Sequence, residues 1–184
     1  MSELQETNSN ESVPSKSQNI KRTLKSWSAT VIVFLVTVAV MQVVLYFIRF
    51  PTVDGNSMSP TYDDNEQVIM IYTKSVHVND VVIAWSSYLD EYIIKRVVGM
   101  QGDHIVINDM GLYRNDKLVT ESYISIEDWA AQSDHIDIVV PDGEVFLMGD
   151  NRTDSTDSRV IGSISIDDVF GKVICENPIF SLSK

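Results

Sequence analysis

The chain has 184 residues, of which 44% are hydrophobic and 22% are charged, so it is neither a disordered chain nor a polytopic membrane protein. Its net charge is −12 at pH 7, and the excess of acidic residues lies after residue 48. An acidic globular part argues against a nucleic-acid binding protein, whose surface would be basic. The single cysteine, Cys175, excludes an intramolecular disulfide and a cysteine-rich zinc site.

The first predicted element is a transmembrane helix over residues 27–48, which are apolar and carry no charge. A helix of this length reaches roughly 33 Å, enough for a hydrocarbon core of about 30 Å. Trp27 and Tyr46 stand near its ends, where aromatic rings favour the membrane interface. A cleaved signal peptide is disfavoured, because the run is too long and no small-x-small site precedes Arg49. A buried helix of a soluble protein is the other alternative.

The basic residues around this segment predict its orientation. Lys21, Arg22 and Lys25 precede it, whereas only Arg49 follows it directly. The positive-inside rule then predicts a single-pass protein of the cell membrane, with its N-terminus in the cytoplasm. Residues 1–26 are expected to form a disordered cytoplasmic N-terminus, because their first part is rich in Ser, Asn, Gln and Glu.

Residues 49–184 are predicted to form a mainly β, antiparallel domain outside the membrane. Short β-branched runs alternate with turn residues such as Asn79-Asp80 and Gly102-Asp103. The stretch 104–119 is typical of successive hairpin strands, and the one helical candidate is 125–132. The predicted strands cover residues 67–72, 80–85, 92–99, 103–108, 144–149 and 172–176.

Ser57 lies in the stretch GNSMSPTY, residues 55–62, shortly after the apolar segment. It is either a polar turn residue or a nucleophile, and a serine hydroxyl is a poor nucleophile until a base takes its proton. The sequence offers three histidines as that base, His77, His104 and His135. Nothing in their local sequence marks any of them for this role.

Lys95 is the better candidate for the base. Strand side chains alternate, so in YIIKRVVG (92–99) Ile93, Lys95 and Val97 share one face of the strand. Burial between these β-branched neighbours would disfavour the ammonium form and lower the pKa of the lysine, which is about 10.4 in water. The alternative is a lysine whose amine reaches solvent at the edge of the sheet.

The stretch GDNRTDSTDSR, residues 149–159, directly follows a predicted strand and is dense in Asp, Ser, Asn and Arg. Its acidic positions do not follow the alternating spacing of an EF-hand calcium loop. Asp157 and Arg159 would share a face if the backbone were extended. The stretch is therefore either a solvated polar loop or a segment that brings several hydroxyls and charges to one point.

These stretches, in this order behind an N-terminal anchor, resemble the sequence boxes of the bacterial type I signal peptidases, which are membrane-bound Ser/Lys endopeptidases. The likeness runs from the anchor to about Gly171, and the single span is similar to Gram-positive members. The departures from the family pattern are Asn79 for glycine, Gln101 for proline, and Thr153 with Asp154 for Asp-Asn. The matching stretches are Gly55, Ser57, Met58, Pro60 and Thr61, then NDVVI (79–83), KRVVGMQGD (95–103) and GDNRTDSTDSR (149–159).

The resemblance implies a role for each matched position in the reaction. Ser57 would be the nucleophile and Lys95 the general base. Ser155 would hydrogen-bond Lys95 and orient it, and Met58 would help to bury the lysine. The backbone N–H of Ser57 would donate to the oxyanion, without the hydroxyl that some members carry at the position of Gly55.

The resemblance also implies two supporting ion pairs and a substrate. Asp150 would pair with Arg96, and Asp157 with Arg159. The substrate would be the signal peptide of an exported preprotein, bound along a strand edge with small residues at positions −1 and −3. No metal, cofactor or obligate protein partner is expected, and the anchor would contact membrane lipid.

Two other functions stay open. The self-cleaving repressors of the SOS response use a similar Ser/Lys pair, but they have no membrane anchor and usually carry a DNA-binding domain. The family also contains catalytically silent, membrane-anchored paralogues that act as binding proteins, and we expect those to lack the serine or the lysine. An α/β-hydrolase is disfavoured because GNSMS does not complete the G-x-S-x-G motif.

Overall fold

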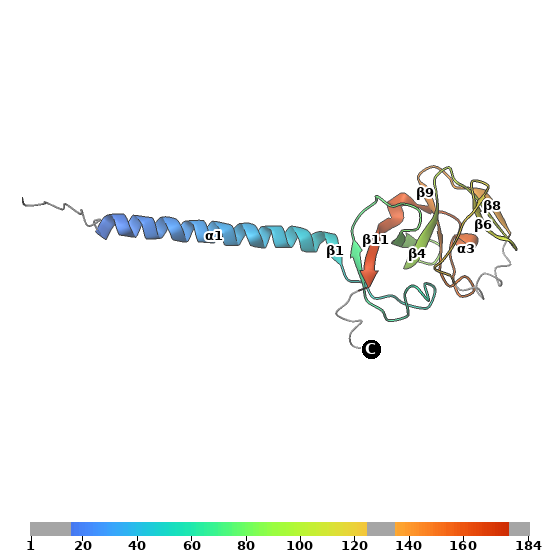
Figure 1. Cartoon of the computed structure of the whole chain (residues 1–184), viewed down its shortest axis with the longest axis horizontal. Helices are drawn as coiled ribbons and strands as arrows, with labels where there is room; N and C mark the ends of the chain where they lie inside the picture. The colour runs from blue at the N-terminus through green and yellow to red at the C-terminus, as the bar shows by residue number, and fades with distance from the viewer. Residues whose placement is uncertain (1–15, 125–134, 177–184) are drawn as a thin grey trace, which may run out of the picture. The chain divides into compact units, whose positions relative to one another are not determined.

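The computed structural model describes residues 16–124 and 135–176, with the backbone alone for residues 16–26 and 28. The chain divides into two compact units, Met1–Leu45 and Tyr46–Lys184. The first unit contains one long helix and the second contains all the strands described below (Figure 1). The predicted helix 125–132 lies outside the described residues.

The helix α1, Lys16–Phe47, contains the predicted apolar segment and begins before it. Its portion Ala29–Phe47 is long and apolar enough to cross a membrane, and none of that portion is buried. The disorder expected for residues 1–26 is wrong for residues 16–26, which are helical; residues 1–15 lie outside the described part. The sequence between Lys16 and Trp27 has no Pro or Gly, and extending an existing helix is easier than nucleating one.

The larger sheet of the second unit is antiparallel and has seven strands in the order β1-β2-β11-β3-β4-β9-β10. Its longest strand, β4, pairs with β3 over its first half and with β9 over its second half. The strands are β1 Ile48–Arg49, β2 Val68–Ile71, β3 Val81–Ser86, β4 Glu91–Met100, β9 Glu144–Met148, β10 Ile164–Ser165 and β11 Val169–Glu176.

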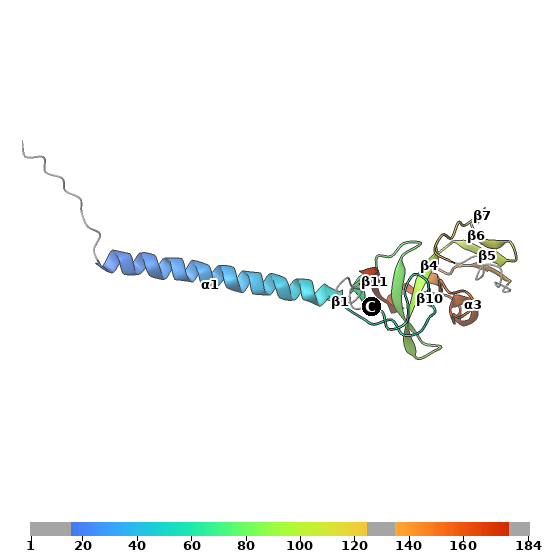
Figure 2. The same cartoon turned by 60° about the horizontal axis from the view of Figure 1, so that its bottom comes forward.

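The smaller antiparallel sheet has four strands in the order β7-β6-β5-β8. In Figure 2 its strands lie at the end of the unit opposite β1 and β11. Two short helical turns complete the described elements, α3 Ser158–Ile161 and η1 Ile166–Asp168. The strands of this sheet are β5 His104–Asn108, β6 Gly111–Arg114, β7 Lys117–Leu118 and β8 Ile136–Val139.

The predicted mainly β, antiparallel fold is confirmed, and each of the six predicted strands is present. The sequence did not predict β1, β8 or β10. Two of these have only two residues each, and such short strands carry no periodic signal of their own. They are strands because a longer neighbour supplies their hydrogen-bond partners.

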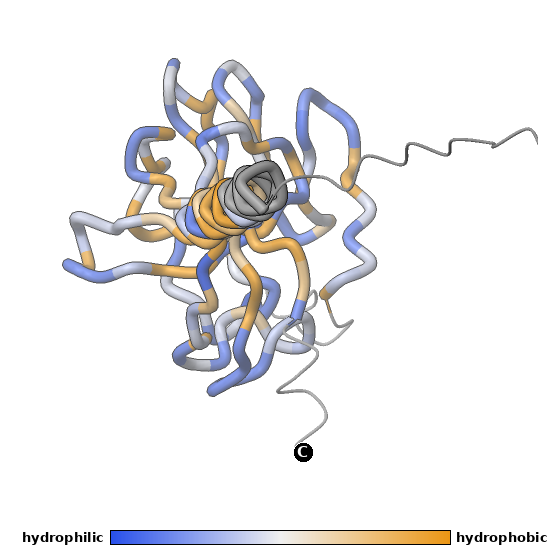
Figure 3. The backbone as a smooth tube through the Cα atoms, turned by 90° about the vertical axis from the view of Figure 1, so that its left-hand side faces the viewer, coloured by the Kyte–Doolittle hydropathy of each residue, from blue (hydrophilic) through white to orange (hydrophobic). Residues whose placement is uncertain are grey.

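Strand β4 is buried on both faces, from Ile93 to Gly99. On one face Ile93 and Val97 pack into a core cluster with residues of β3 and β9. On the other face Ile94 packs with Met58 and with residues of β2 and β11. Figure 3 shows hydrophilic segments at the loop tips of the second unit, which we call the outer unit for its expected position, and the buried apolar side chains of the strands form its core. A basic side chain in this part of β4 is therefore buried, whichever face of the strand it lies on.

Candidate active site

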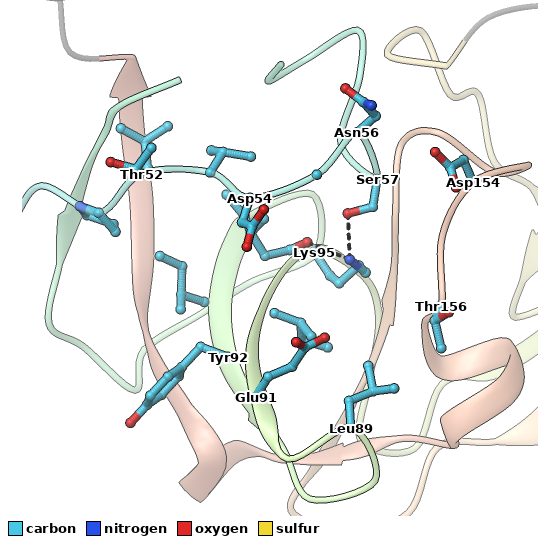
Figure 4. A pocket seen from close by; sticks show the side chains of 17 residues that line it. Thr52, Asp54, Asn56, Ser57, Leu89, Glu91, Tyr92, Lys95, Asp154 and Thr156 are labelled. Carbon is cyan, nitrogen blue, oxygen red and sulfur yellow. Dashed lines mark hydrogen bonds between the residues drawn. The ribbon is translucent and has the colours of Figure 1, made fainter. Parts of the chain in front are cut away.

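Ser57 and Lys95 meet at hydrogen-bond distance. Lys95 Nζ lies 2.7 Å from Ser57 Oγ and also donates to the carbonyl oxygen of Ile94 over 3.0 Å (Figure 4). The two residues are 38 positions apart in the sequence, and this contact joins the loop that contains Ser57 to β4. The two residues that the sequence singles out as nucleophile and base are thus brought together.

Lys95 is buried, with 4% of its surface exposed. Burial lowers the pKa of the Lys95 amine, while the negative charges of Asp157 and Glu91 act in the opposite direction and are too weak to restore it. A lysine with a lowered pKa is unprotonated over more of the neutral range and can accept a proton. Its immediate neighbour, Ser57 Oγ, carries the proton that it would take.

Asp157 is the buried carboxylate beside this pair, and its oxygens are fully engaged elsewhere. It accepts hydrogen bonds from Arg159 Nε at 2.8 Å and from the Gly149 N–H at 2.9 Å, and it caps α3. The predicted Asp157–Arg159 pair is therefore present. Because Asp157 already has these partners, it acts on Lys95 only through its charge.

Ser155 differs from the prediction. Its hydroxyl donates to Asp157 Oδ2 over 2.8 Å, whereas the two hydrogen bonds of Lys95 Nζ go to Ser57 and Ile94. The predicted Ser155–Lys95 hydrogen bond is not made in this structure. The physical reason is that an ionised carboxylate is a stronger acceptor than an amine for a nearby hydroxyl.

The stretch 149–159 holds the backbone of the nucleophile in place. The N–H of Asn151 donates to the carbonyl oxygen of Ser57 over 3.1 Å, and its side-chain amide donates to the carbonyl oxygen of Asn56 over 3.2 Å. Gly149 permits this approach, because a Cβ atom there would collide with the Ser57 carbonyl oxygen and with the Ser155 side chain. The stretch is therefore not a solvated polar loop. It is the other alternative left open by the sequence, a segment that brings several polar groups to one point.

The predicted ion pair of Arg96 and Asp150 lies on the opposite face of β4 from Lys95. Arg96 donates to both carboxylate oxygens of Asp150, over 2.8 Å and 2.5 Å, and its third nitrogen donates to the carbonyl oxygen of Asn79. Thr61 also donates to Asp150 over 2.5 Å. This network ties the serine-containing loop, β4 and the stretch after β9 together.

A second buried ion pair was not predicted. Arg152, inside the stretch 149–159, pairs with Glu121, and its Nε donates to the carbonyl oxygen of Gly149 over 3.0 Å. Tyr123 donates to Glu121 over 2.8 Å, and the guanidinium of Arg96 lies 4.0 Å from its ring centroid. The one sequence signal was an arginine within a polar loop, and nothing in the sequence named its partner 31 residues away.

Met58 is completely buried, but in the cluster that contains Ile94, on the face of β4 opposite Lys95. Its side chain does not line the cleft in which Lys95 lies. The buried methionine therefore anchors the serine-containing loop into the core directly after Ser57.

A cleft of about 460 Å³ opens over the serine–lysine pair. In Figure 4 Ser57 and Lys95 point toward one another in this cleft, with the carboxylates of Asp54, Glu91 and Asp154 around it. Its apolar walls come from Pro51, Val53, Val68, Ile83, Leu89, Ile93 and Ile94. The cleft thus joins the candidate nucleophile and base to a surface of mixed polar and apolar side chains on which a peptide can lie.

The three histidines lie away from this cleft. His77 pairs with Asp80, His104 lies 2.8 Å from Asp137, and the His135 side chain is 70% exposed. None of them is among the residues that line the cleft. Across residues 16–124 and 135–176, no group of three or more His, Cys, Asp or Glu side chains could hold a metal ion.

Comparison with known proteins gives matches over most of the chain. Residues 24–176 match the family model described as signal peptidase, peptidase S26. The chain is 33% identical over 178 residues to signal peptidase IB of Staphylococcus aureus (strain Mu50 / ATCC 700699), covering 84% of this chain and 89% of that protein. It is 30% identical over 150 residues to signal peptidase I U of Bacillus subtilis (strain 168), covering 76% and 80% respectively.

A search of solved structures finds a similar chain in the crystal structure of a signal peptidase I from Enterococcus faecalis V583. The TM-score is 0.49 and the identity is 24%, over 54% of this chain and 97% of that one. The family assignment rests on the sequence matches, which extend from the anchor through the serine–lysine pair to β11. On these matches, the chain belongs to the signal peptidase family, peptidase S26.

Proposed function

We propose that this protein is a serine endopeptidase that removes signal peptides from exported preproteins, with Ser57 as nucleophile and Lys95 as general base. The observation that carries the proposal is the 2.7 Å contact between Lys95 Nζ and Ser57 Oγ at a buried lysine. Family membership supports the substrate class, since the matched relatives are named signal peptidase I. The geometry supports the mechanism.

In the proposed mechanism the neutral amine of Lys95 accepts the hydroxyl proton as Ser57 Oγ attacks the scissile carbonyl carbon. The resulting ammonium donates that proton to the leaving amine, the C–N bond breaks, and the signal peptide stays bound as an ester. Lys95, neutral again, takes a proton from water, and the hydroxide hydrolyses the ester. The ammonium of Lys95 then donates that proton to Ser57 Oγ as the ester C–O bond breaks, so the signal peptide leaves as a carboxylic acid and the serine hydroxyl and neutral lysine are restored.

The oxyanion formed during each attack needs hydrogen-bond donors, and we assign the backbone N–H of Ser57 to this role. Gly55 carries no side chain that could add a hydroxyl, and its own N–H already donates to Asp64 Oδ1 over 2.8 Å. Asn151 keeps the Ser57 peptide unit in position through its hydrogen bond to the Ser57 carbonyl oxygen. The support of the oxyanion therefore depends on the backbone of the nucleophile itself.

The substrate is proposed to bind as an extended strand along β4. The pairing of β4 with β9 begins only at Arg96, so Glu91–Lys95 have no paired strand on that side among the described elements. A peptide that adds a strand there gains backbone hydrogen bonds and presents alternate side chains to the cleft. Small residues at −1 and −3 fit walls formed by closely packed Ile93, Ile94 and Val53.

The proposed location is the outer face of the cell membrane. The apolar part of α1 supports a single membrane span, and the basic residues before it support a cytoplasmic N-terminus. The cleft would then lie on the side where the cleavage site of an exported preprotein emerges. The proposed partners are the signal peptides and the surrounding lipid, without nucleic acid, cofactor or obligate protein partner.

Cleavage of a purified preprotein by the full chain in detergent tests this function. We expect the wild type to release the signal peptide, and Ser57→Ala and Lys95→Ala each to lose at least about a thousandfold in kcat, because both groups act in the same step. Ser163→Ala, at a serine outside the cleft, is the matched control. An intact preprotein after incubation with the wild type would instead support a silent, binding paralogue, and activity in either variant would contradict the mechanism.

A further inference from the structure

A second pocket of about 380 Å³, almost entirely apolar, lies on the outer unit beside the catalytic cleft. Phe50 and Tyr92 form part of its rim and are 49% and 57% exposed, whereas Met70 at its base is buried. Exposed aromatic surface of this kind marks a binding surface when it lines a hollow. The pocket is lined by Phe50, Pro51, Met70, Ile83, Tyr92 and Phe170, with Arg49 beside them.

The apolar pocket is continuous with the catalytic cleft. Pro51, Ile83 and Tyr92 line both. In Figure 4 the ring of Tyr92 points away from the Ser57–Lys95 pair. Tyr92 precedes Lys95 by three positions on β4, which is about 10 Å along a strand. A peptide strand that runs along β4 from the catalytic pair therefore reaches this pocket about three to five residues from the scissile bond.

The position of the pocket along the chain indicates which end of a substrate enters it. Arg49 and Phe50 follow the end of α1 at Phe47 by two and three residues, so they lie within about 10 Å of the end of the apolar segment. In a signal peptide the apolar region precedes the cleavage site. The pocket is thus the part of the cleft that lies closest along the chain to the apolar segment, and we expect the apolar region of a membrane-bound signal peptide to arrive there.

We propose that this pocket is a subsite for an apolar side chain of the signal peptide, located upstream of the small residue at −3. The inference rests on the proposed function and extends its substrate preference. A leucine-sized side chain in the pocket would cover the exposed rings of Phe50 and Tyr92. A lipid acyl chain is the other conceivable occupant, but the walls shared with the cleft favour the peptide.

Two peptide probes test the subsite with the full chain in dodecyl maltoside micelles. Both have the same residues from −3 onward, and they carry either leucine or serine from −6 to −4. We expect the wild type to cleave the leucine probe with a kcat/KM about tenfold higher. Phe50→Ser should lose most of this preference. Tyr88→Ser, which removes a 70% exposed ring outside the pocket, should keep it.

The outcomes separate the two proposals. A wild type without preference for the leucine probe, or a Phe50→Ser variant with undiminished preference, overturns the subsite. The same assay is repeated in lipid vesicles. If Phe50→Ser then loses activity equally on both probes but keeps its activity in micelles, the pocket is assigned to lipid and the subsite is overturned. If the wild type cleaves neither probe, or Ser57→Ala cleaves both, the proposed function itself fails and the subsite fails with it.

Discussion

Lys95 and Arg96 are adjacent basic residues on β4, and the folded structure shifts their pKa values in opposite directions. Both are buried, with 4% and 8% of their surface exposed. Burial lowers the pKa of the Lys95 amine, and nearby carboxylates offset only part of this effect. At Arg96 burial also acts to lower the pKa, but the hydrogen bonds and charge of Asp150 outweigh it and raise the pKa.

The difference between the two residues comes from the carboxylate that each one meets. Asp150 faces Arg96 directly and forms two hydrogen bonds with it. Asp157, the carboxylate near Lys95, is instead held by Arg159, Ser155 and the N–H of Gly149. Burial alone thus produces a base at position 95, and burial with a contacting counter-ion produces a permanent structural cation one residue later.

The largest effect on stability is expected from removing the counter-ion of Arg96. Asp150→Asn leaves a buried guanidinium without its counter-ion, which should reduce the free energy of unfolding by about 3–5 kcal/mol. Urea denaturation of the outer unit measures this change. Asp154→Asn, in the same loop but exposed, is the matched control and should change stability by less than about 0.5 kcal/mol. Equal stability of the two variants would show that Arg96 does not depend on Asp150.

A smaller effect of opposite sign is expected on the Lys95 side. Lys95→Met should stabilise the second unit by about 1 kcal/mol at neutral pH, because it removes a buried amine that loses its hydration and has no contacting carboxylate. The pKa of Lys95 is lower in the folded state than its ordinary value of 10.5. Protonation therefore opposes folding, so the gain from Lys95→Met should be largest at low pH and should vanish as the pH rises past 10.5.

Thermal unfolding at several pH values measures this gain, with the exposed Lys117→Met as control. A Lys95→Met variant less stable than the wild type at every pH would indicate that the lysine contributes a favourable interaction. Activity must be lost in either case, since methionine cannot accept a proton.

The smallest effect is expected from Glu91, whose charge raises the pKa of Lys95. Cleavage by the wild type should fall as the pH decreases through the pKa of Lys95, because the ammonium form cannot act as a base. Glu91→Gln removes the favourable charge, lowers that pKa further and should move the acid limb of the kcat/KM profile to lower pH. Asp109→Asn, in the turn between β5 and β6, should leave the limb in place. A limb that moves to higher pH would reverse the assigned role of Glu91.

Much of the site was predictable because its residues stand in short stretches with distinctive chemistry. The alternation of apolar residues around Lys95 indicated a buried strand face, and the order of the boxes indicated the family. Asp157 and Arg159 are two residues apart, so their pairing was a local inference. By contrast, Arg152 pairs with Glu121 across 31 residues, and no local pattern identifies that partner.

The role of Ser155 shows where sequence reasoning ends. A hydroxyl near a lysine and a carboxylate can donate to either, and the choice depends on distances that chain order does not contain. In the folded protein the Ser155 hydroxyl donates to the carboxylate of Asp157. The packing of Met58 likewise depends on the fold, since its side chain belongs to the core cluster that contains Ile94.

The sequence by itself determined the long apolar segment, the longer strands, the family and the candidate pair Ser57 and Lys95, because hydrophobic runs, strand alternation and short motifs are local properties. The tertiary structure alone decided which carboxylate each buried cation meets, which hydroxyl reaches which acceptor, and where an apolar pocket opens beside the cleft. These depend on contacts between segments far apart in the chain, whose energies arise only when packing excludes water and brings the groups within a few ångströms.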